Sequence, residues 1–243
     1  MKSEAIAYTV AGGKFEGQLV WDDTAPIPRP LLLMCPNWAG VTPRAIEIGH
    51  ELAAHGYVVF VADMHGLDRR PTGKENPMQF LEPLIASPET TRARVNAALE
   101  VMTKEAASRG IGKTSMRAAM GYCFGGSNVL DLARSGADVA AVVSYHGNLG
   151  TRMPAKKGAV KAAVLVVHGA ADPVAPKSDR DAVEAEMDAA DARWTMLMFG
   201  GVLHNFTDPT SNRPPSSKYA AHANRYGYSL GHAFIADAFA GTV

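Results

Sequence analysis

The sequence contains 243 residues, and its 24 basic and 24 acidic side chains give a formal net charge of zero. This balance excludes a global electrostatic attraction to nucleic acid or to a membrane surface, and two cysteines are too few for a disulfide framework. The apolar fraction of 47% is typical of a soluble globular protein. The N-terminal residues lack the apolar region of a signal peptide, and no apolar run reaches membrane-spanning length. We therefore expect a cytoplasmic protein with a single domain over residues 1–243.

The first half of the chain predicts β-strands that alternate with helices. Thr42 and Pro43 predict the N-cap and first residue of a helix that stops at Gly56, and Ser87-Pro88 predicts the start of a long helix. An irregular stretch between these helices is long for a loop, which favours a lid or a binding wall. In chain order we expect hairpin strands at 6–10 and 15–21, a buried strand at 31–35, a helix at 42–55, a strand at 57–62, the irregular stretch at 64–88 and a helix at 87–108.

The second half repeats this alternation. A glycine-rich turn at 121–126 joins a mostly apolar strand at 116–120 to a helix at 127–133. Beyond it we expect strands at 139–145, 160–167 and 195–199, a helix at 179–191, a polar loop at 205–217 and a last helix at 219–240 that is broken or kinked near Gly227. Buried strands that alternate with helices predict the α/β class, with a mostly parallel sheet and helices on both of its faces.

The turn Gly121-Tyr122-Cys123-Phe124-Gly125-Gly126 has the context of a nucleophile elbow, usually written G-x-S-x-G. Cys123 takes the place of the serine in that pattern. Side chains at Gly121 and Gly125 would collide with the neighbouring strand and helix, which explains the glycines. The start of the next helix would favour a thiolate. The alternative is a buried structural cysteine beside a glycine turn.

Polar residues follow the predicted strands, at the sheet edge where open parallel sheets bind ligands. Cys123, Asp172 and His204 occur in the order nucleophile, acid, histidine. In such a triad the histidine accepts the thiol proton or lies beside a thiolate, later protonates the leaving group, and is oriented by the aspartate. The main-chain N–H groups of Phe124 and Trp38 are predicted to stabilise an oxyanion. The polar residues at strand ends are Asn37, Asp63, Cys123, His146, His168, Asp172 and His204.

Other residues compete for these roles. His146 and His168 are alternative bases or structural histidines, and Asp208 is an alternative partner for His204. Cys35 lies within a predicted buried strand and is expected in the core. No pair of histidines has metal-ligand spacing on one helix, which argues against a metal site. Three further histidines are expected at the surface or behind the site: His50, His55 and His65.

In these motifs the sequence resembles the dienelactone hydrolase family, the cysteine-nucleophile branch of the α/β hydrolases. The matching segments are Gly121–Gly126, Ser144–Gly147, His168–Pro173 and His204–Thr207, and the similarity in order and spacing extends from about residue 5 to residue 240. The resemblance implies an α/β-hydrolase fold that hydrolyses lactones and esters through a cysteinyl acyl-enzyme, without a metal or organic cofactor. It also implies the site residues: a triad of Cys123, Asp172 and His204, an oxyanion hole at Trp38 and Phe124, and substrate contacts from Asn37, Tyr122, Tyr145 and Phe206.

Two positions differ from the family's pattern. Asn37 stands where members acting on dienelactone usually carry a glutamate that helps to control the protonation of the thiol, and an amide cannot accept a proton in that way. Asp208 stands near the place of an arginine that holds the substrate carboxylate in those enzymes, and like charges repel. The arginines that could replace it are Arg69, Arg70, Arg92 and Arg94.

The leading hypothesis is a hydrolase of small carboxylic esters or lactones with a Cys-His-Asp triad. One alternative is a thioesterase or acyl-transferase that forms the same acyl-enzyme. Another is a ligand-binding protein without activity on the same scaffold. The expected partner is a small-molecule ester or lactone, with no nucleic acid and no membrane. The sequence leaves the oligomeric state open and is compatible with a monomer.

Overall fold

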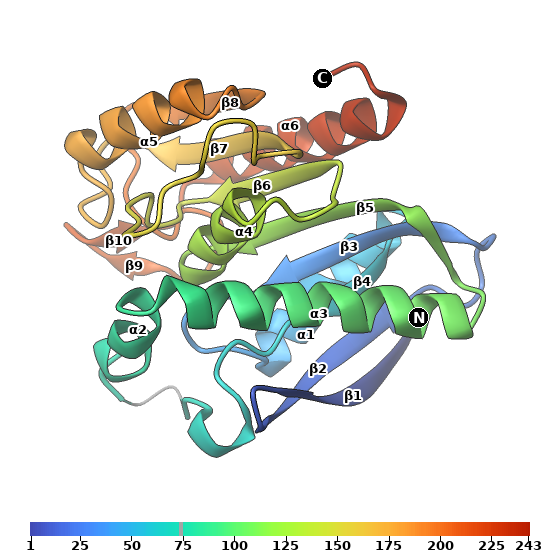
Figure 1. Cartoon of the computed structure of the whole chain (residues 1–243). Coiled ribbons are helices and arrows are strands. Elements are labelled where there is room, and N and C mark those ends of the chain that lie inside the picture. Colours follow the sequence, from blue (N-terminus) through green and yellow to red (C-terminus); the bar gives the residue numbers. More distant parts are fainter. Residues whose placement is uncertain (73–74) are drawn as a thin grey trace. The chain divides into compact units, whose positions relative to one another are not determined.

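The computed structural model describes residues 1–72 and 75–243, and Figure 1 shows the course of the chain. The chain forms two compact units, residues 1–119 and 120–243. Strand β5 (Gly112–Tyr122) runs across this boundary, and the strand order of the sheet is β1-β2-β4-β3-β5-β6-β7-β8. The single domain expected over the whole chain stays a prediction.

The strands of the first unit form a hairpin and a parallel pair. The hairpin turns at Ala11 and Gly12, whose φ angles of 47° and 83° suit a tight turn. Strand β2 pairs with β4 in antiparallel orientation, and β3 pairs with β4 in parallel. These strands confirm the predicted ones: β1 (Lys2–Val10), β2 (Gly13–Trp21), β3 (Arg29–Cys35) and β4 (Val58–Val61).

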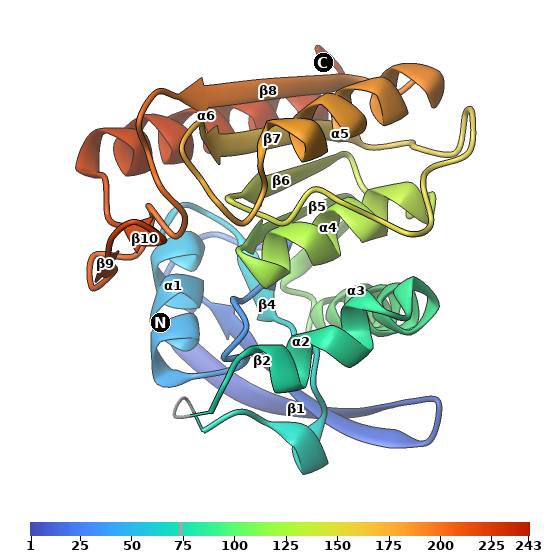
Figure 2. The same cartoon turned by 90° about the vertical axis from the view of Figure 1, so that its left-hand side faces the viewer.

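Two helices of this unit cover opposite faces of its strands (Figure 2). A Cβ atom on Gly49, in α1, would lie 3.4 Å from the Val20 side chain, so α1 packs on the face to which Val20 points. In α3 the Arg94 guanidinium lies 5.0 Å from the centre of the Phe15 ring. Val20 and Phe15 point to opposite faces because side chains alternate along a strand. The helices are α1 (Pro43–Ala54), α2 (Met78–Ile85) and α3 (Pro88–Ser108), with a 3-10 turn η1 at Leu67–Arg69.

The ends of α1 and α3 follow the predicted signals, but the stretch between them does not. The Thr42 hydroxyl accepts the N–H of Ala45 at 3.2 Å, as an N-cap does. Within the stretch predicted to be irregular, residues 64–88, helix α2 forms, so that prediction was wrong for residues 78–85. Pro83 suggested irregular structure, but α3 supports the end of α2, because the Thr91 hydroxyl donates to the carbonyl of Leu84 at 3.0 Å. Residues 73–74 of that stretch lie outside the described residues.

The second unit consists of parallel strands between helices. Strand β6 pairs with β7, and β7 pairs with β8, both in parallel. A Cβ atom on Gly126, in α4, would meet the Ser144 hydroxyl, whereas one on Gly231, in α6, would meet that of Tyr145. Ser144 and Tyr145 are neighbours on strand β6, so their side chains point to opposite faces, and α4 and α6 cover opposite faces of the sheet. Helix α5 lies on the same side as α4 (Figure 2). The elements are α4 (Phe124–Arg134), β6 (Ala141–Tyr145), β7 (Ala163–Gly169), α5 (Lys177–Ala189), β8 (Trp194–Phe199), β9 (Asn212–Arg213), β10 (Ser217–Lys218) and α6 (Ala221–Ala240).

Helix α6 runs unbroken through Gly227, so the break expected there was wrong, and the kink given as its alternative stays a prediction. The glycine serves close packing. A Cβ atom at Gly227 would lie 3.0 Å from Val167 Cγ1 and 3.4 Å from the Tyr145 ring. In place of a break, the Tyr145 hydroxyl donates to the Gly227 carbonyl at 3.1 Å and ties α6 to strand β6.

The architecture is the predicted α/β class, with a mostly parallel sheet and helices on both faces. All residues of β4, β6 and β7 are buried, as expected of strands covered on both faces. Within residues 1–72 and 75–243, no helix has both the length and the apolarity needed to cross a membrane.

Candidate active site

Cys123 occupies a sharp turn between a strand and a helix. Strand β5 ends at Tyr122 and helix α4 begins at Phe124, so Cys123 alone makes the turn, with φ 54° and ψ −118°. A Cβ atom on Gly121 would lie 2.0 Å from the carbonyl oxygen of Gly125, which is far closer than atoms can approach. This confirms the predicted steric reason for Gly121. The backbone holds an unusual conformation that presents the thiol at the start of α4.

The structure brings the three predicted triad residues together. The Nε2 atom of His204 lies 3.1 Å from Cys123 Sγ, and its Nδ1 atom lies 2.8 Å from Asp172 Oδ2. The other carboxylate oxygen of Asp172 accepts the N–H of Val174 at 2.8 Å, which fixes the carboxylate plane. Asp172 follows β7 and His204 follows β8, and these parallel strands end at the same edge of the sheet.

The surroundings of His204 favour its protonated form. Burial alone would lower its pKa, but hydrogen bonds and charge from Asp172 and Cys123 outweigh burial and raise the pKa to about 10. At neutral pH the imidazole is therefore protonated. Its Nδ1–H donates to the carboxylate and its Nε2–H donates to the sulfur.

The alternative bases, His146 and His168, occupy different positions. His146 accepts the main-chain N–H of Cys123 at Nδ1 (3.1 Å), and its Nε2 lies 2.8 Å from the Thr207 hydroxyl. His168 Nε2 lies 3.6 Å from Asp172 Oδ2, too far for a hydrogen bond. Burial lowers the pKa of both histidines, despite the charge of Asp172 beside His168. Both are therefore neutral at neutral pH.

The loop that carries His204 is anchored by its backbone. The His204 carbonyl accepts the N–H of Lys218, a residue of the short strand β10, at 3.1 Å. Asp208, the alternative partner for His204, instead accepts the N–H and hydroxyl of Thr210 at 2.9 and 2.8 Å. An amide hydrogen bond from Asn205 at 3.3 Å completes this turn. The carboxylate of Asp208 therefore stabilises its own loop.

Three of the predicted substrate contacts lie in an aromatic cluster. Tyr122 and Tyr145 stack with their ring centres 5.2 Å apart, and the Tyr228 hydroxyl donates to that of Tyr122 at 2.9 Å. Tyr145 and Phe206 have no exposed surface, and Phe206 packs edge-on against His146 at 5.0 Å. These contacts make the cluster a support for the site. Its contact with a substrate stays a prediction.

In the first unit, Asn37 and Trp38 lie in the loop that follows β3. The side-chain oxygen of Asn37 accepts the N–H of Ala39 at 3.0 Å, and the main-chain carbonyl of Asn37 accepts the N–H of Gly40. The Trp38 carbonyl accepts a hydrogen bond from His65 Nε2 at 2.8 Å, so this nitrogen carries a proton. This contact of His65 could not be predicted from the sequence, because His65 and Trp38 lie in separate loops. The roles of Asn37 and Trp38 stay predictions.

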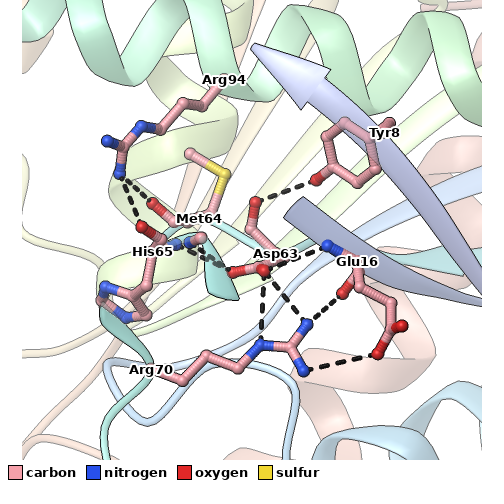
Figure 3. Close-up of polar contacts among 8 residues, drawn as sticks. Tyr8, Glu16, Asp63, Met64, His65, Arg70 and Arg94 are labelled. Carbon is pink, nitrogen blue, oxygen red and sulfur yellow. Dashed lines mark hydrogen bonds and ion pairs between the residues drawn. The ribbon is translucent and has the colours of Figure 1, made fainter. Parts of the chain in front are cut away.

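Asp63 is held within a polar network that joins its own loop to strand β2 and helix α3 (Figure 3). Its carboxylate accepts the N–H groups of His65 and Gly66, at 2.9 and 3.0 Å, and lies 3.1 Å from the Arg70 guanidinium. Arg94 donates to the carbonyls of Met64 and His65, at 2.7 and 3.3 Å. Two of the four arginines suggested as a carboxylate clamp are therefore engaged in this network, and the other two, Arg69 and Arg92, stay a prediction.

Among residues 1–72 and 75–243, no group of three or more His, Cys, Asp or Glu side chains is arranged to hold a metal ion. The site geometry is instead that of a thiol, an imidazole and a carboxylate in a row, which is the arrangement of nucleophilic catalysis.

Comparisons with known proteins agree with this architecture. The model of the dienelactone hydrolase family matches residues 15–238. A dienelactone hydrolase-like promiscuous phosphotriesterase from metagenomic libraries is 29% identical, with a TM-score of 0.88 and coverage of 97% of this chain and 98% of that chain. The protein named m3DLH is 30% identical, with a TM-score of 0.88 and 98% of each chain covered. A carboxylesterase from Lactobacillus plantarum, 15% identical with a TM-score of 0.65, shares the fold over 96% of this chain and 98% of its own. A search of the curated proteins gave no match.

Proposed function

Because the chain belongs to the dienelactone hydrolase family, a family of α/β hydrolases, we propose that it hydrolyses small carboxylic esters or lactones through Cys123, His204 and Asp172. One observation carries this proposal. Sulfur, imidazole and carboxylate are joined by two contacts of 3.1 and 2.8 Å on a strained turn at the end of strand β5. A cysteine kept only for packing has no need of a histidine and an aspartate in line with its sulfur.

The reaction would begin with the proton on His204. The imidazolium donates to Cys123 Sγ, so the sulfur can attack the substrate carbonyl as a thiolate. A C–S bond forms and the carbonyl electrons move to oxygen, which makes a tetrahedral oxyanion. The main-chain N–H groups predicted to stabilise that oxyanion are those of Phe124 and Trp38.

Collapse of this intermediate breaks the C–O bond of the ester. His204 gives its Nε2 proton to the departing oxygen, which leaves as an alcohol, or as a tethered hydroxyl when the substrate is a lactone. The now neutral His204 then takes a proton from water, which attacks the thioester of the acyl-enzyme. Release of the carboxylic acid product restores the thiolate and the imidazolium.

Asp172 orients His204 and keeps its proton in place. Its Oδ2 atom accepts the His204 Nδ1–H at 2.8 Å, which leaves Nε2 facing the sulfur. The carboxylate is held in turn by the N–H of Val174. The carboxylate of Asp172 also compensates the positive charge of the imidazolium.

The 29% identical neighbour, described as a promiscuous phosphotriesterase, suggests phosphotriester hydrolysis as a second activity of the same thiol. A thioesterase or acyl-transferase reaction would use the same acyl-enzyme. The substrate panel should therefore contain p-nitrophenyl esters, lactones, thioesters and a chromogenic phosphotriester. The preferred leaving group separates these activities.

The test measures turnover of this panel by the wild type and by Cys123→Ala and His204→Ala. We expect both variants to lose at least ~10³-fold in kcat/KM, as is usual when a member of a catalytic triad is removed. Cys35→Ala is the matched control, because Cys35 is the other cysteine of the chain, is fully buried, and has a pKa that burial raises to about 12. Full esterase activity in Cys123→Ala would refute the proposed function.

A further inference from the structure

We propose that His146 is a positioning residue that joins the Cys123 turn to the loop carrying His204, as a neutral imidazole with its proton on Nε2. The inference rests on the proposed function, since it assigns a support to that triad. His146 follows strand β6 and has no exposed surface. It lies between two segments that are 81 residues apart in the chain but must hold their side chains within 3.1 Å.

The contact at Nδ1 determines the protonation of the ring. The main-chain N–H of Cys123 donates to His146 Nδ1 at 3.1 Å, and an amide nitrogen can only donate, so Nδ1 carries a lone pair. The same N–H also reaches the carbonyl of Tyr145 at 3.0 Å. Two consecutive residues at the end of β6 therefore hold the backbone of Cys123. Its strained φ angle of 54° requires such support from its surroundings.

The contact at Nε2 reaches the other segment. With Nδ1 as acceptor, the neutral ring carries its proton on Nε2, which donates to the Thr207 hydroxyl at 2.8 Å. Thr207 lies three residues after His204. The His146 ring therefore joins the amide of the nucleophile to the loop of the acid–base residue by two directed hydrogen bonds.

The ring of His146 also lies against His204. The two ring centres are 5.2 Å apart and the ring planes meet at 71°, so the rings make an edge-to-face contact. On its other sides His146 meets Phe206 and Tyr122, with ring centres 5.0 and 6.5 Å away. The ionisable groups that act on it are His204 and His168. Burial and these two histidines keep its pKa well below the ordinary value, which agrees with the neutral form that the hydrogen bonds require.

A positioning role predicts a specific pattern among substitutions. His146→Leu fills much of the ring volume but offers no acceptor, whereas His146→Asn is smaller and places Oδ1 near the position of Nδ1. We expect His146→Leu to lower kcat about 100-fold with KM changed less than about 3-fold, because a small misplacement of reacting groups has that effect. His146→Asn should recover at least ~10-fold of that loss. Thr207→Val, which removes only the acceptor of Nε2–H, should lower kcat by about 10-fold.

The same variants are tested by the rate at which iodoacetamide alkylates Cys123, which needs no substrate turnover. Alkylation should slow in His146→Leu and recover in His146→Asn. His222→Leu is the matched control, because His222 is an exposed histidine of α6 that lies outside the site, and both rates should equal those of the wild type. Thermal unfolding of each variant identifies any that fail to fold, and Thr207→Val tests the inference independently if the His146 variants do not fold.

The outcomes separate this inference from the proposed function. If His146→Leu equals or exceeds His146→Asn in both turnover and alkylation, the ring acts by packing alone and the inference is overturned. If the Cys123→Ala variant keeps the turnover of the wild type, the proposed function fails. In that case the ranking of alkylation rates still reports whether His146 positions the thiol.

Discussion

The substitution Gly121→Ala tests the steric argument for the nucleophile turn. A Cβ atom at this position would lie 2.0 Å from the Gly125 carbonyl oxygen, 2.3 Å from the carbonyl carbon and 2.8 Å from the Gly126 nitrogen. An ordinary contact begins at 3.4 Å, so the first turn of α4 would have to move by about 1.4 Å, the difference between 3.4 and 2.0 Å. The obstacle is backbone, which cannot rotate away as a side chain can.

The size of the effect follows from this geometry. Overpacking with a single methyl group usually costs about 1–3 kcal/mol, and a backbone obstacle places Gly121→Ala near the upper end. For a chain of this size that corresponds to a fall in Tm of about 6–12 °C. A shift of α4 also moves Cys123 away from His204 Nε2, now 3.1 Å from its sulfur, so we expect the alkylation rate and kcat to fall by about 100-fold.

The assay compares Gly121→Ala with Gly200→Ala by calorimetry, alkylation of Cys123 and ester turnover. Gly200 is a matched control, because a Cβ atom there would have no neighbour within 4 Å and its φ angle is not positive. We expect Gly200→Ala to keep the wild-type Tm or to raise it slightly. A Gly121→Ala protein with unchanged Tm and unchanged alkylation rate would refute the reasoning.

Three further predictions follow from the charges of the second unit and the buried histidines. Asp172→Asn should lower the pKa of His204 and reduce kcat/KM by about 10⁴-fold at neutral pH. The pH–rate profile of the variant measures this, and a loss in kcat/KM of less than 10-fold would contradict it. Arg134→Ala should destabilise the fold by about 3–5 kcal/mol in urea unfolding, because it leaves Glu186, now bound at 2.8 and 2.9 Å, without its cation. Arg44→Ala, at an exposed site, should cost less than about 1 kcal/mol. Acidification below about pH 6.5 should destabilise the protein, because unfolded histidines bind protons that the buried ones, with lowered pKa, do not. The free energy of unfolding should therefore fall between pH 6.5 and pH 5.5, a range in which folded His204 stays protonated because its pKa is raised to about 10, and equal stability at these two pH values would exclude the prediction. The histidines with lowered pKa are His65, His146 and His168.

The sequence sufficed for the fold class and for the residues that meet around Cys123, because both depend on local signals. Buried apolar runs and helix starts identify the strands and helices, and parallel strands end at one edge of the sheet. Asp172 and His204 each follow such a strand. Their approach to Cys123 is therefore a consequence of the order of elements, which the sequence contains.

Other features depend on contacts between segments that are distant in the sequence. Helix α2 forms in spite of Pro83 because Thr91, on α3, donates to the carbonyl of Leu84. Helix α6 continues through Gly227 because the glycine admits strand β6 rather than ending the helix. In both cases the local propensity is weaker than the tertiary contact.

The role inferred for His146 was also beyond the sequence, which left it as an alternative base or a structural residue. Its assignment depends on the direction of its ring, and ring direction follows from the backbone of Cys123 and from Thr207. A histidine after a strand is compatible with either role until both of its nitrogens have partners. Spacing along the chain does not contain that information.

Three histidines at this edge of the sheet share one ordinary pKa, and their surroundings separate them. Burial acts on all three, but only His204 has hydrogen bonds to both a carboxylate and a sulfur, and its pKa rises while those of His146 and His168 fall. A charge on either neighbour would oppose the imidazolium and weaken its hold on the proton. The three rings therefore carry one positive charge, on His204, whose Nε2–H faces the sulfur of Cys123.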